Sequence, residues 1–409
     1  MPRDSAAVLA SGYDTELSTS RPTLRDLSRF FLWLGATGFG GPIALVGIME
    51  RELVERRGWA TREEFKDGIA FSQLAPGPLA AQLAIYLGWL CRGVAGASVA
   101  GVAFIAPSFS MVLALSALYV RYGGIPWLQG AFYGVGAAVI AIVARSAAKL
   151  ARTTVARDRL LWALFATSAV VTVWTESELV LVFIGSGLVA MLASAPGLTS
   201  ARAASIAMLW RFAGAPSAAS AAGVSAGALG VAVPAATATV LFLYFASAGL
   251  FVFGSGLAIV PFLHGGVVQQ HHWLTERQFL DAVAVALITP GPVVITVAFI
   301  GFLVAGPIGA TAAALGVFAP VYLLTVLLAR YYHRWKTRRA VRAFVDGVTA
   351  AATGAIAGAA IVLGRRALTD VPTAMIAAAT LGLLLLAGRR VPEPLVIVAA
   401  GIAGVLLRG

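Results

Sequence analysis

The sequence contains few charges, one cysteine and four histidines. Only 12% of its 409 residues are charged, about half the share of an ordinary soluble domain. Cys91 has no second cysteine with which to form an intrachain disulfide, and it does not lie at a metal-ligand spacing. We find no Ser-His-Asp order, no His-Glu-x-x-His and no carboxylate pair at catalytic spacing. We therefore expect no enzyme, no metal and no cofactor.

Apolar residues make up 59% of the chain. They form about ten to twelve segments that approach the ~20 residues needed to span a bilayer, among them 94–120, 128–144, 179–193 and 374–388. This pattern predicts an all-α polytopic membrane protein embedded in a lipid bilayer. The net charge of +12 lies in short clusters between these segments, which indicates orientation signals rather than a nucleic-acid surface.

The chain contains its own sequence twice, at an offset of 214 residues. The shared positions are Phe39, Gly40, Trp59, Thr61, Phe65, Asp67, Pro76, Gly77 and Pro78, which match Phe253, Gly254, Trp273, Thr275, Phe279, Asp281, Pro290, Gly291 and Pro292. Internal repeats in an apolar chain are typical of secondary transporters. We place the first repeat at 23–150 and the second at 237–364. A tail (1–22) without the apolar core of a signal peptide, a spacer with two or three membrane segments (151–236) and a C-terminal membrane hairpin (365–409) complete the chain.

Basic residues indicate that the two repeats are inserted in opposite directions. Residues 50–66 carry five Lys or Arg and the equivalent 264–280 carry one, whereas 121–129 carry one and 330–342 carry six. Because Lys and Arg favour the cytoplasmic side, we predict inverted-topology repeats. An odd number of crossings must then separate 50–66 from 121–129, although two apolar segments, 65–90 and 94–120, lie between them. We therefore predict that each Pro-Gly-Pro lies in a re-entrant helix hairpin, since proline breaks a helix.

The two Pro-Gly-Pro elements are candidate anion sites, although a structural kink is the simpler alternative. After each break a new helix begins with unpaired N–H groups and a positive dipole end, which can hold an oxyanion. The candidate substrate-binding residues are Pro76, Gly77, Pro78, Ser72, Gln73 and Gln82 in the first copy and Pro290, Gly291, Pro292, Thr289 and Thr296 in the second.

Small residues interrupt the first apolar segment of each repeat. Gly40, Gly41 and Pro42 correspond to Gly254, Ser255 and Gly256, and we add these to the candidate substrate site as helix breaks. Close helix packing is the alternative, and a nucleotide-binding loop is disfavoured because no strand precedes it. Whether segments 27–49 and 243–263 cross fully stays open. Such faces would also permit a homodimer.

Several charged residues have a structural and a functional interpretation. Thr61 and Glu64 form a predicted helix-capping box. Asp67 and Asp281 recur early in equivalent helices, where a helix dipole favours acids, and a coupling or gating role is the alternative. Arg51, Arg92, Arg145 and Asp346 border apolar segments, where a side chain can reach the interface or serve function; of these we retain Arg51 and Asp346 as coupling or gating candidates. His264, His271 and His272 are expected in a solvated loop.

These residues resemble the chromate ion transporter family in its long two-repeat form. The stretches are FGGPIALVGIMERELVERRGW (39–59), APGPLAAQLAIYLGW (75–89), FGSGLAIVPF (253–262) and TPGPVVITVAFIGF (289–302). The resemblance implies export of chromate across the bacterial inner membrane, with sulfate as a mimic or counter-substrate. Some resistance members have a glutamate and a histidine where this chain has Leu79 and Glu50.

Transport driven by the membrane potential or by ion or sulfate exchange is our leading interpretation. Moving two negative charges outward down an inside-negative potential releases about 4.6 kcal/mol per 100 mV, and no ATP-binding motif is present. The alternatives are a transporter of sulfate or another small anion, an anion channel, or a membrane scaffold that transports nothing. A scaffold has no use for two opposed helix breaks.

Overall fold

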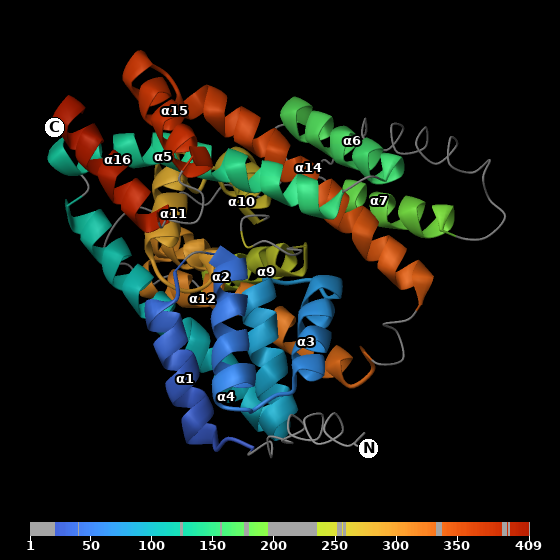
Figure 1. Ribbon diagram of the computed structural model, residues 1–409. Helices are drawn as coiled ribbons and strands as arrows, with labels where there is room; N and C mark the ends of the chain where they lie inside the picture. Colours follow the sequence, from blue (N-terminus) through green and yellow to red (C-terminus); the bar gives the residue numbers. More distant parts are fainter. Residues whose placement is uncertain are drawn as a thin grey trace, which may run out of the picture.

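The computed structural model describes residues 21–39, 41–122, 126–155, 158–175, 180–194, 235–251, 256, 259–332, 338–386, 391 and 393–408. Within these ranges every regular element is helical and there is no strand (Figure 1). Four described helical stretches are long and apolar enough to cross a membrane: 79–122, 129–152, 293–329 and 339–367. Shorter apolar helices accompany them. The prediction of an all-α membrane protein is confirmed.

The elements occur twice in nearly the same order. The first series is α1 (Leu24–Thr37), α2 (Gly41–Met49), η1 (Glu50–Arg56), α3 (Arg62–Leu74), α4 (Leu79–Tyr122), α5 (Pro126–Thr154), α6 (Arg159–Thr175) and α7 (Val180–Ala193). The second is α9 (Ala235–Phe251), α10 (Ile259–Leu263), η3 (His264–Gln270), α11 (Glu276–Ile288), η4 (Val293–Ile295), α12 (Thr296–Ala329), α14 (Arg339–Ala367), α15 (Val371–Leu386) and α16 (Glu393–Arg408). The first apolar segment of the first copy leaves the helical conformation at Gly38, between α1 and α2. Between α9 and α10, residues 252–255, 257 and 258 lie outside the described residues.

Each copy repeats the same local structure before its Pro-Gly-Pro. The elements η1 and η3 are π-helices, a rare form that often occurs near functional sites. Thr61 then caps α3 together with Glu64, and Thr275 caps α11 together with Gln278, each in a reciprocal capping box. The predicted box at Thr61 is confirmed, and the equivalent helix of the second copy begins with a capping box as well.

The long helices α4 and α12 each contain a sharp turn. Arg92 and Gly93 leave the helical conformation in α4, as do Ala305 and Gly306 in α12. A side chain on Gly88 would overlap the carbonyl of Gly96, although eight residues span about 12 Å in a straight helix. The chain therefore doubles back here. The two turns are 213 residues apart rather than 214, so the second copy is one residue shorter between its Pro-Gly-Pro and this turn.

The two copies exchange helices. Within each copy α1 packs on α4 and α9 on α12, but α5 packs on α15 and α16, whereas α14 packs on α6 and α7. Figure 1 shows α6 and α7 on the opposite side of the molecule from α15 and α16. The segment expected to be a spacer thus contributes two helices that cover α14. The packing of α6 and α7 on α14 thus matches the packing of α15 and α16 on α5.

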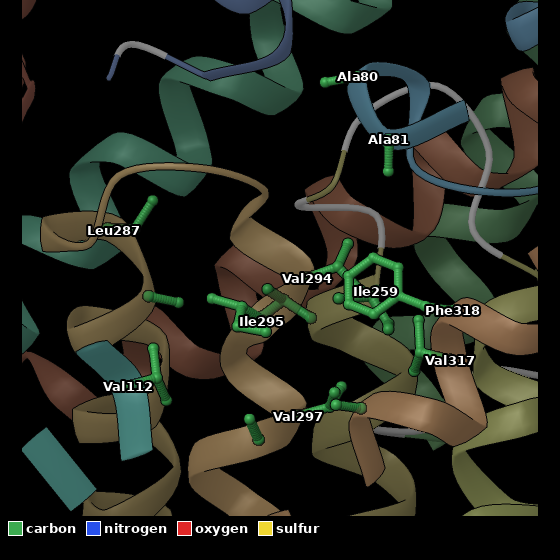
Figure 2. Close-up of a cluster of buried hydrophobic side chains, with 14 of the residues drawn as sticks. Ala80, Ala81, Val112, Ile259, Leu287, Val294, Ile295, Val297, Val317 and Phe318 are labelled. Atoms are coloured by element: carbon green, nitrogen blue, oxygen red, sulfur yellow. The ribbon is translucent and has the colours of Figure 1, made fainter. Parts of the chain in front are cut away.

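The core joins the starts of the helices that follow both Pro-Gly-Pro elements. Ala80 and Ala81 from α4 are buried, as are Val294, Ile295 and Val297 from η4 and α12, and all belong to one hydrophobic cluster (Figure 2). Because these side chains are apolar, polar chemistry at this depth must come from backbone groups and from a few polar side chains.

Candidate functional site

The first Pro-Gly-Pro forms a tight turn between α3 and α4. Gly77 has φ 139°, a conformation that side chains disfavour. The first helical bond of α4 runs from the Gln82 N–H to the Pro78 carbonyl at 3.0 Å, so the N–H groups ahead of it have no acceptor within the helix. The Gln82 side chain is fully buried, and its Nε2 donates to the Pro76 carbonyl at 2.7 Å.

The second Pro-Gly-Pro repeats this turn between α11 and η4. Gly291 has φ 100°, and the Ile295 N–H bonds to the Pro292 carbonyl at 3.0 Å. Two buried threonines flank it, and both satisfy their hydroxyls locally. Thr289 donates to the Val285 carbonyl at 2.6 Å, and Thr296 to the Val293 carbonyl at 2.8 Å.

Each turn contacts the long helix of the other copy. A side chain at Gly77 would approach Val321 of α12 within 2.7 Å, and one at Gly291 would overlap the Ser108 hydroxyl of α4. Ser108 and Val321 are equivalent, because both follow the doubled-back turns at the offset of 213. The Gly291 N–H also donates to the carbonyl of Gly38, next to the first helix break, at 2.9 Å. The structure therefore brings both turns into the interface between the copies.

The structure describes only some of the candidate substrate-site residues at the glycine-rich interruptions. Gly40, Gly254 and Ser255 lie outside the described residues. Gly41 begins α2, followed by half-buried Pro42. Gly256 is buried against Val293 and Val294, the two residues that directly follow the second Pro-Gly-Pro.

Two polar candidates of α3 differ in position. The buried Ser72 hydroxyl bonds to the Gly68 carbonyl of its own helix at 2.8 Å, which is the usual satisfied state of a serine in a helix. Gln73 is exposed. Among the described hydrogen bonds, neither side chain bonds to the turn. Of the three polar candidates in the first copy, Gln82 bonds to the turn directly.

Among the charged candidates, Asp281 is the buried one. Only 3% of it is exposed, and the hydroxyl of Tyr119, at the end of α4, donates to its Oδ2 at 2.7 Å. Asp67 is half-buried, whereas Arg51 and Asp346 are exposed on η1 and α14. Sequence patterns did not indicate Tyr119 or Ser108, because their partners lie in the other copy.

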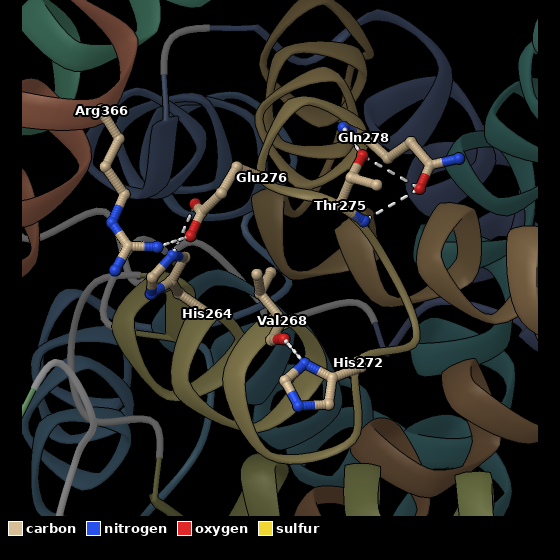
Figure 3. A network of polar contacts seen from close by, with 7 residues as sticks. All are labelled: His264, Val268, His272, Thr275, Glu276, Gln278 and Arg366. Atoms are coloured by element: carbon tan, nitrogen blue, oxygen red, sulfur yellow. Dashed lines mark hydrogen bonds and ion pairs between the residues drawn. The ribbon is translucent and has the colours of Figure 1, made fainter. Parts of the chain in front are cut away.

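His264 is part of a polar network rather than a solvated loop, so that expectation was wrong. It is 2% exposed, and its Nε2 lies 2.8 Å from Oε2 of Glu276, which also pairs with Arg366 (Figure 3). His272 Nδ1 contacts the Val268 carbonyl at 2.8 Å. The network ties the start of α11 to the end of α14. His271 is half-buried, whereas His272 is exposed.

Comparison with known proteins places this architecture in a family. The chain matches the chromate transporter family twice, at residues 25–191 and 239–405. This chain belongs to the chromate transporter family. The chromate transport protein of Cupriavidus metallidurans is 51% identical over 94% of this chain and 93% of its own length. The chromate transport protein of Pseudomonas aeruginosa is 33% identical over 92% and 91%. No solved structure matches the chain.

The family matches extend past the repeat ends expected at 150 and 364. The first includes α6 and nearly all of α7, and the second includes α15 and most of α16. These are the helices that the copies exchange. Each chromate transporter repeat therefore carries two helices that pack on α5 or α14 of the other repeat.

Proposed function

We propose that this chain is a secondary transporter that exports chromate from the bacterial cytoplasm. Relatives that align over nearly their whole length are named chromate transport proteins, which supports the substrate. The proposed binding site lies between the two Pro-Gly-Pro turns. The observation that supports this site is a pair of matching contacts between the copies. Gly77 of the first copy lies against α12, and Gly291 of the second copy lies against α4.

Backbone groups would supply most of the binding. Pro-Gly-Pro leaves the first N–H groups of the following helices without helical acceptors, and a helix start carries about half a positive charge. Such a site suits a tetrahedral oxyanion and needs no dedicated cation. This agrees with the apolar side chains that surround both turns.

The exchanged helices support inverted repeats. Contacts of α5 with α15 and α16 return as contacts of α14 with α6 and α7, as a two-fold relation between the copies would require. Reversal of the Lys and Arg clusters favours an axis in the membrane plane over one along its normal. Alternating access would then be rocking of one copy against the other around a shared site.

Contacts around the first turn support a re-entrant hairpin. Cys91, before the doubled-back turn of α4, lies with its Sγ 3.7 Å from the carbonyl of Trp59, which precedes α3. Between these ends, Phe71 of α3 stacks on Tyr86 of α4 with ring centroids 5.2 Å apart. The chain would thus enter and leave on the same side, with Pro-Gly-Pro at the tip.

Cellular chromium tests the function. Expression in a chromate-sensitive bacterium should lower chromium accumulation, and replacing Pro76, Gly77 and Pro78 by alanine should abolish this effect. Gly382→Ala is the control, because no atom lies within 4 Å of the added carbon. Membrane levels of each variant are measured alongside. Unchanged accumulation with the wild-type chain would refute chromate export.

Reconstituted vesicles separate the finer alternatives. A carrier should show saturation and counterflow, whereas a channel shows no counterflow. Sulfate that competes with chromate and accelerates its exchange would indicate an exchanger. Chromate flux that follows an imposed potential without sulfate would indicate a potential-driven carrier.

Cysteine labelling tests the inverted topology. Cysteines are placed at Arg56, Ile125, His271 and Thr337 after replacing the single native Cys91 by alanine. We expect 56 and 337 to react from the cytoplasmic side, and 125 and 271 from the opposite side. Reaction of 56 and 271 from one side would show that the repeats are not inverted.

A further inference from the structure

An arginine rests in an aromatic cradle beside the first helix. Arg57 directly follows η1, and its guanidinium carbon lies 4.9 Å from the Trp59 ring centroid and 5.4 Å from that of Phe30. The two rings meet nearly edge to face, at 83°. Trp33 lies beside Phe30 with centroids 6.1 Å apart. Aromatic faces attract and orient a guanidinium, so the cradle fixes the position of a permanent positive charge.

The cradle borders a hollow of about 270 Å³ lined by Asp26, Arg29, Phe30, Trp33 and Arg57. Of the acids nearby, Asp26 is held by Thr23, and Glu52 is held more closely by Arg56 than by Arg57. Thr23 donates to Asp26 through its N–H and its hydroxyl, at 3.0 and 2.6 Å. Glu52 accepts from Arg56 at 2.8 Å and only at 3.5 Å from Arg57. Arg29 and Arg57 therefore offer donors to the hollow.

The second copy has the same cradle without the charges. His271 takes the place of Arg57, stacking on Trp273 at 4.4 Å and meeting Tyr244 at 5.4 Å. Burial lowers the pKa of His271 below its ordinary value, which favours a neutral ring. Leu243, 60% exposed, replaces Arg29. The fold thus does not need the two arginines for packing, and their presence in one copy calls for another reason.

We propose that this hollow binds a phosphate-type oxyanion, supplied by the head group of an anionic phospholipid. Guanidinium groups bind phosphate oxygens through paired, charge-assisted hydrogen bonds. Next to the hollow, α1 exposes 42% of Leu32 and 47% of Trp33, an apolar face suited to acyl chains with a tryptophan at interface depth. The choice of leaflet rests on the proposed topology, which puts this hollow on the cytoplasmic side, where anionic lipids are enriched.

Lipid retention on the purified full-length chain tests the site. The protein is mixed with phosphatidylglycerol or with zwitterionic phosphatidylethanolamine, and bound lipid is counted by native mass spectrometry. The double variant Arg29→Leu/Arg57→His installs the residues of the second copy. The amount of bound phosphatidylglycerol should fall by a factor of roughly ten or more, as expected for lost charge-assisted hydrogen bonds. The amount of bound phosphatidylethanolamine should not change. Arg62→Leu, a basic residue near η1 but outside the hollow, should retain wild-type binding.

Further arms keep the test decisive. Arg29 is exposed, so Arg29→Leu alone reports on the site even if the double variant folds poorly. The reverse variant Leu243→Arg/His271→Arg should gain phosphatidylglycerol binding. Equal phosphatidylglycerol retention by the wild type, by Arg29→Leu and by Arg29→Leu/Arg57→His would overturn the site. Displacement of lipid by low concentrations of inorganic phosphate would overturn the lipid source and indicate a free oxyanion. Because no arm measures chromate flux, failure here is distinct from failure of the proposed transport.

Discussion

The two Pro-Gly-Pro turns share a backbone but not their polar side chains. Both place a glycine at positive φ after a helix that begins with a capping box. At the first turn, buried Gln82 donates to Pro76, and its Oε1 has no hydrogen-bond partner among the described residues. At the second turn, the equivalent Thr296 bonds to its own backbone. The first turn therefore keeps an unused polar group where the second has none.

The helices that lead into the turns differ in the same way. Asp281 in α11 is buried against Tyr119 of the other copy, whereas its equivalent Asp67 in α3 is half-buried. The two copies thus share the geometry of the turn but differ in their polar groups. A site between the turns would be symmetric in backbone donors and asymmetric in side chains. Matched mutations in the two copies measure how far that asymmetry matters.

The largest effect is expected where both copies depend on the same geometry. Gly291→Ala should abolish transport, because the side chain would be strained at φ 100° by about 1–3 kcal/mol and would overlap Ser108. Gly77→Ala should do the same through Val321 and Gln82. Transport and the yield of folded protein are measured against Gly382→Ala.

A second substitution tests whether the contact between copies is the cause. Ser108→Ala removes the hydroxyl that Gly291→Ala would meet, so the double variant should recover part of the folded yield. A coupling of about 0.5–3 kcal/mol is usual for residues in contact. Strictly additive effects would contradict the contact between Ser108 and the second turn.

The next largest effect is expected to differ between the aspartates. Asp281→Asn keeps an acceptor for Tyr119 but removes the charge. If Asp281 has the coupling or gating role that the sequence offers as an alternative, transport should fall about tenfold, a change of about 1.4 kcal/mol. Asp67→Asn should have a smaller effect, because Asp67 is more exposed. Rates are compared across pH in vesicles. An unchanged rate and pH profile for Asp281→Asn would assign it a purely structural role.

A moderate effect should separate Gln82 from Thr296. Gln82→Leu leaves the Pro76 carbonyl unpaired in the core at a cost of about 1–3 kcal/mol, and we expect a higher KM for chromate. Thr296→Val should change KM little, since its hydroxyl serves only its own helix. The measurement is initial uptake into inverted vesicles. Equal KM changes would remove the proposed asymmetry of the site.

The sequence predicted the parts that depend on local chemistry. Proline and glycine fixed both breaks, and Thr61 with Glu64 fixed the start of α3, because these residues act on their own backbone. Contacts such as Ser108 with Gly291 or Tyr119 with Asp281 were not predictable, since they join residues more than 150 positions apart across copies. The pairing of α6 and α7 with α14 was hidden for the same reason: an apolar helix face does not specify its partner.

The smallest expected difference lies in the capping boxes. Thr61→Ala and Thr275→Ala each remove a side chain that accepts from the third residue of its helix, which costs about 1 kcal/mol. The first box uses the Glu64 carboxylate and the second the Gln278 amide. Only the carboxylate also interacts with the helix dipole, worth about 0.3–1 kcal/mol.

The start of α11 has additional support from Glu276, which pairs with His264 and Arg366. Thr61→Ala should therefore lower thermal stability slightly more than Thr275→Ala, and the opposite order would show that the network around Glu276 does not support the start of α11.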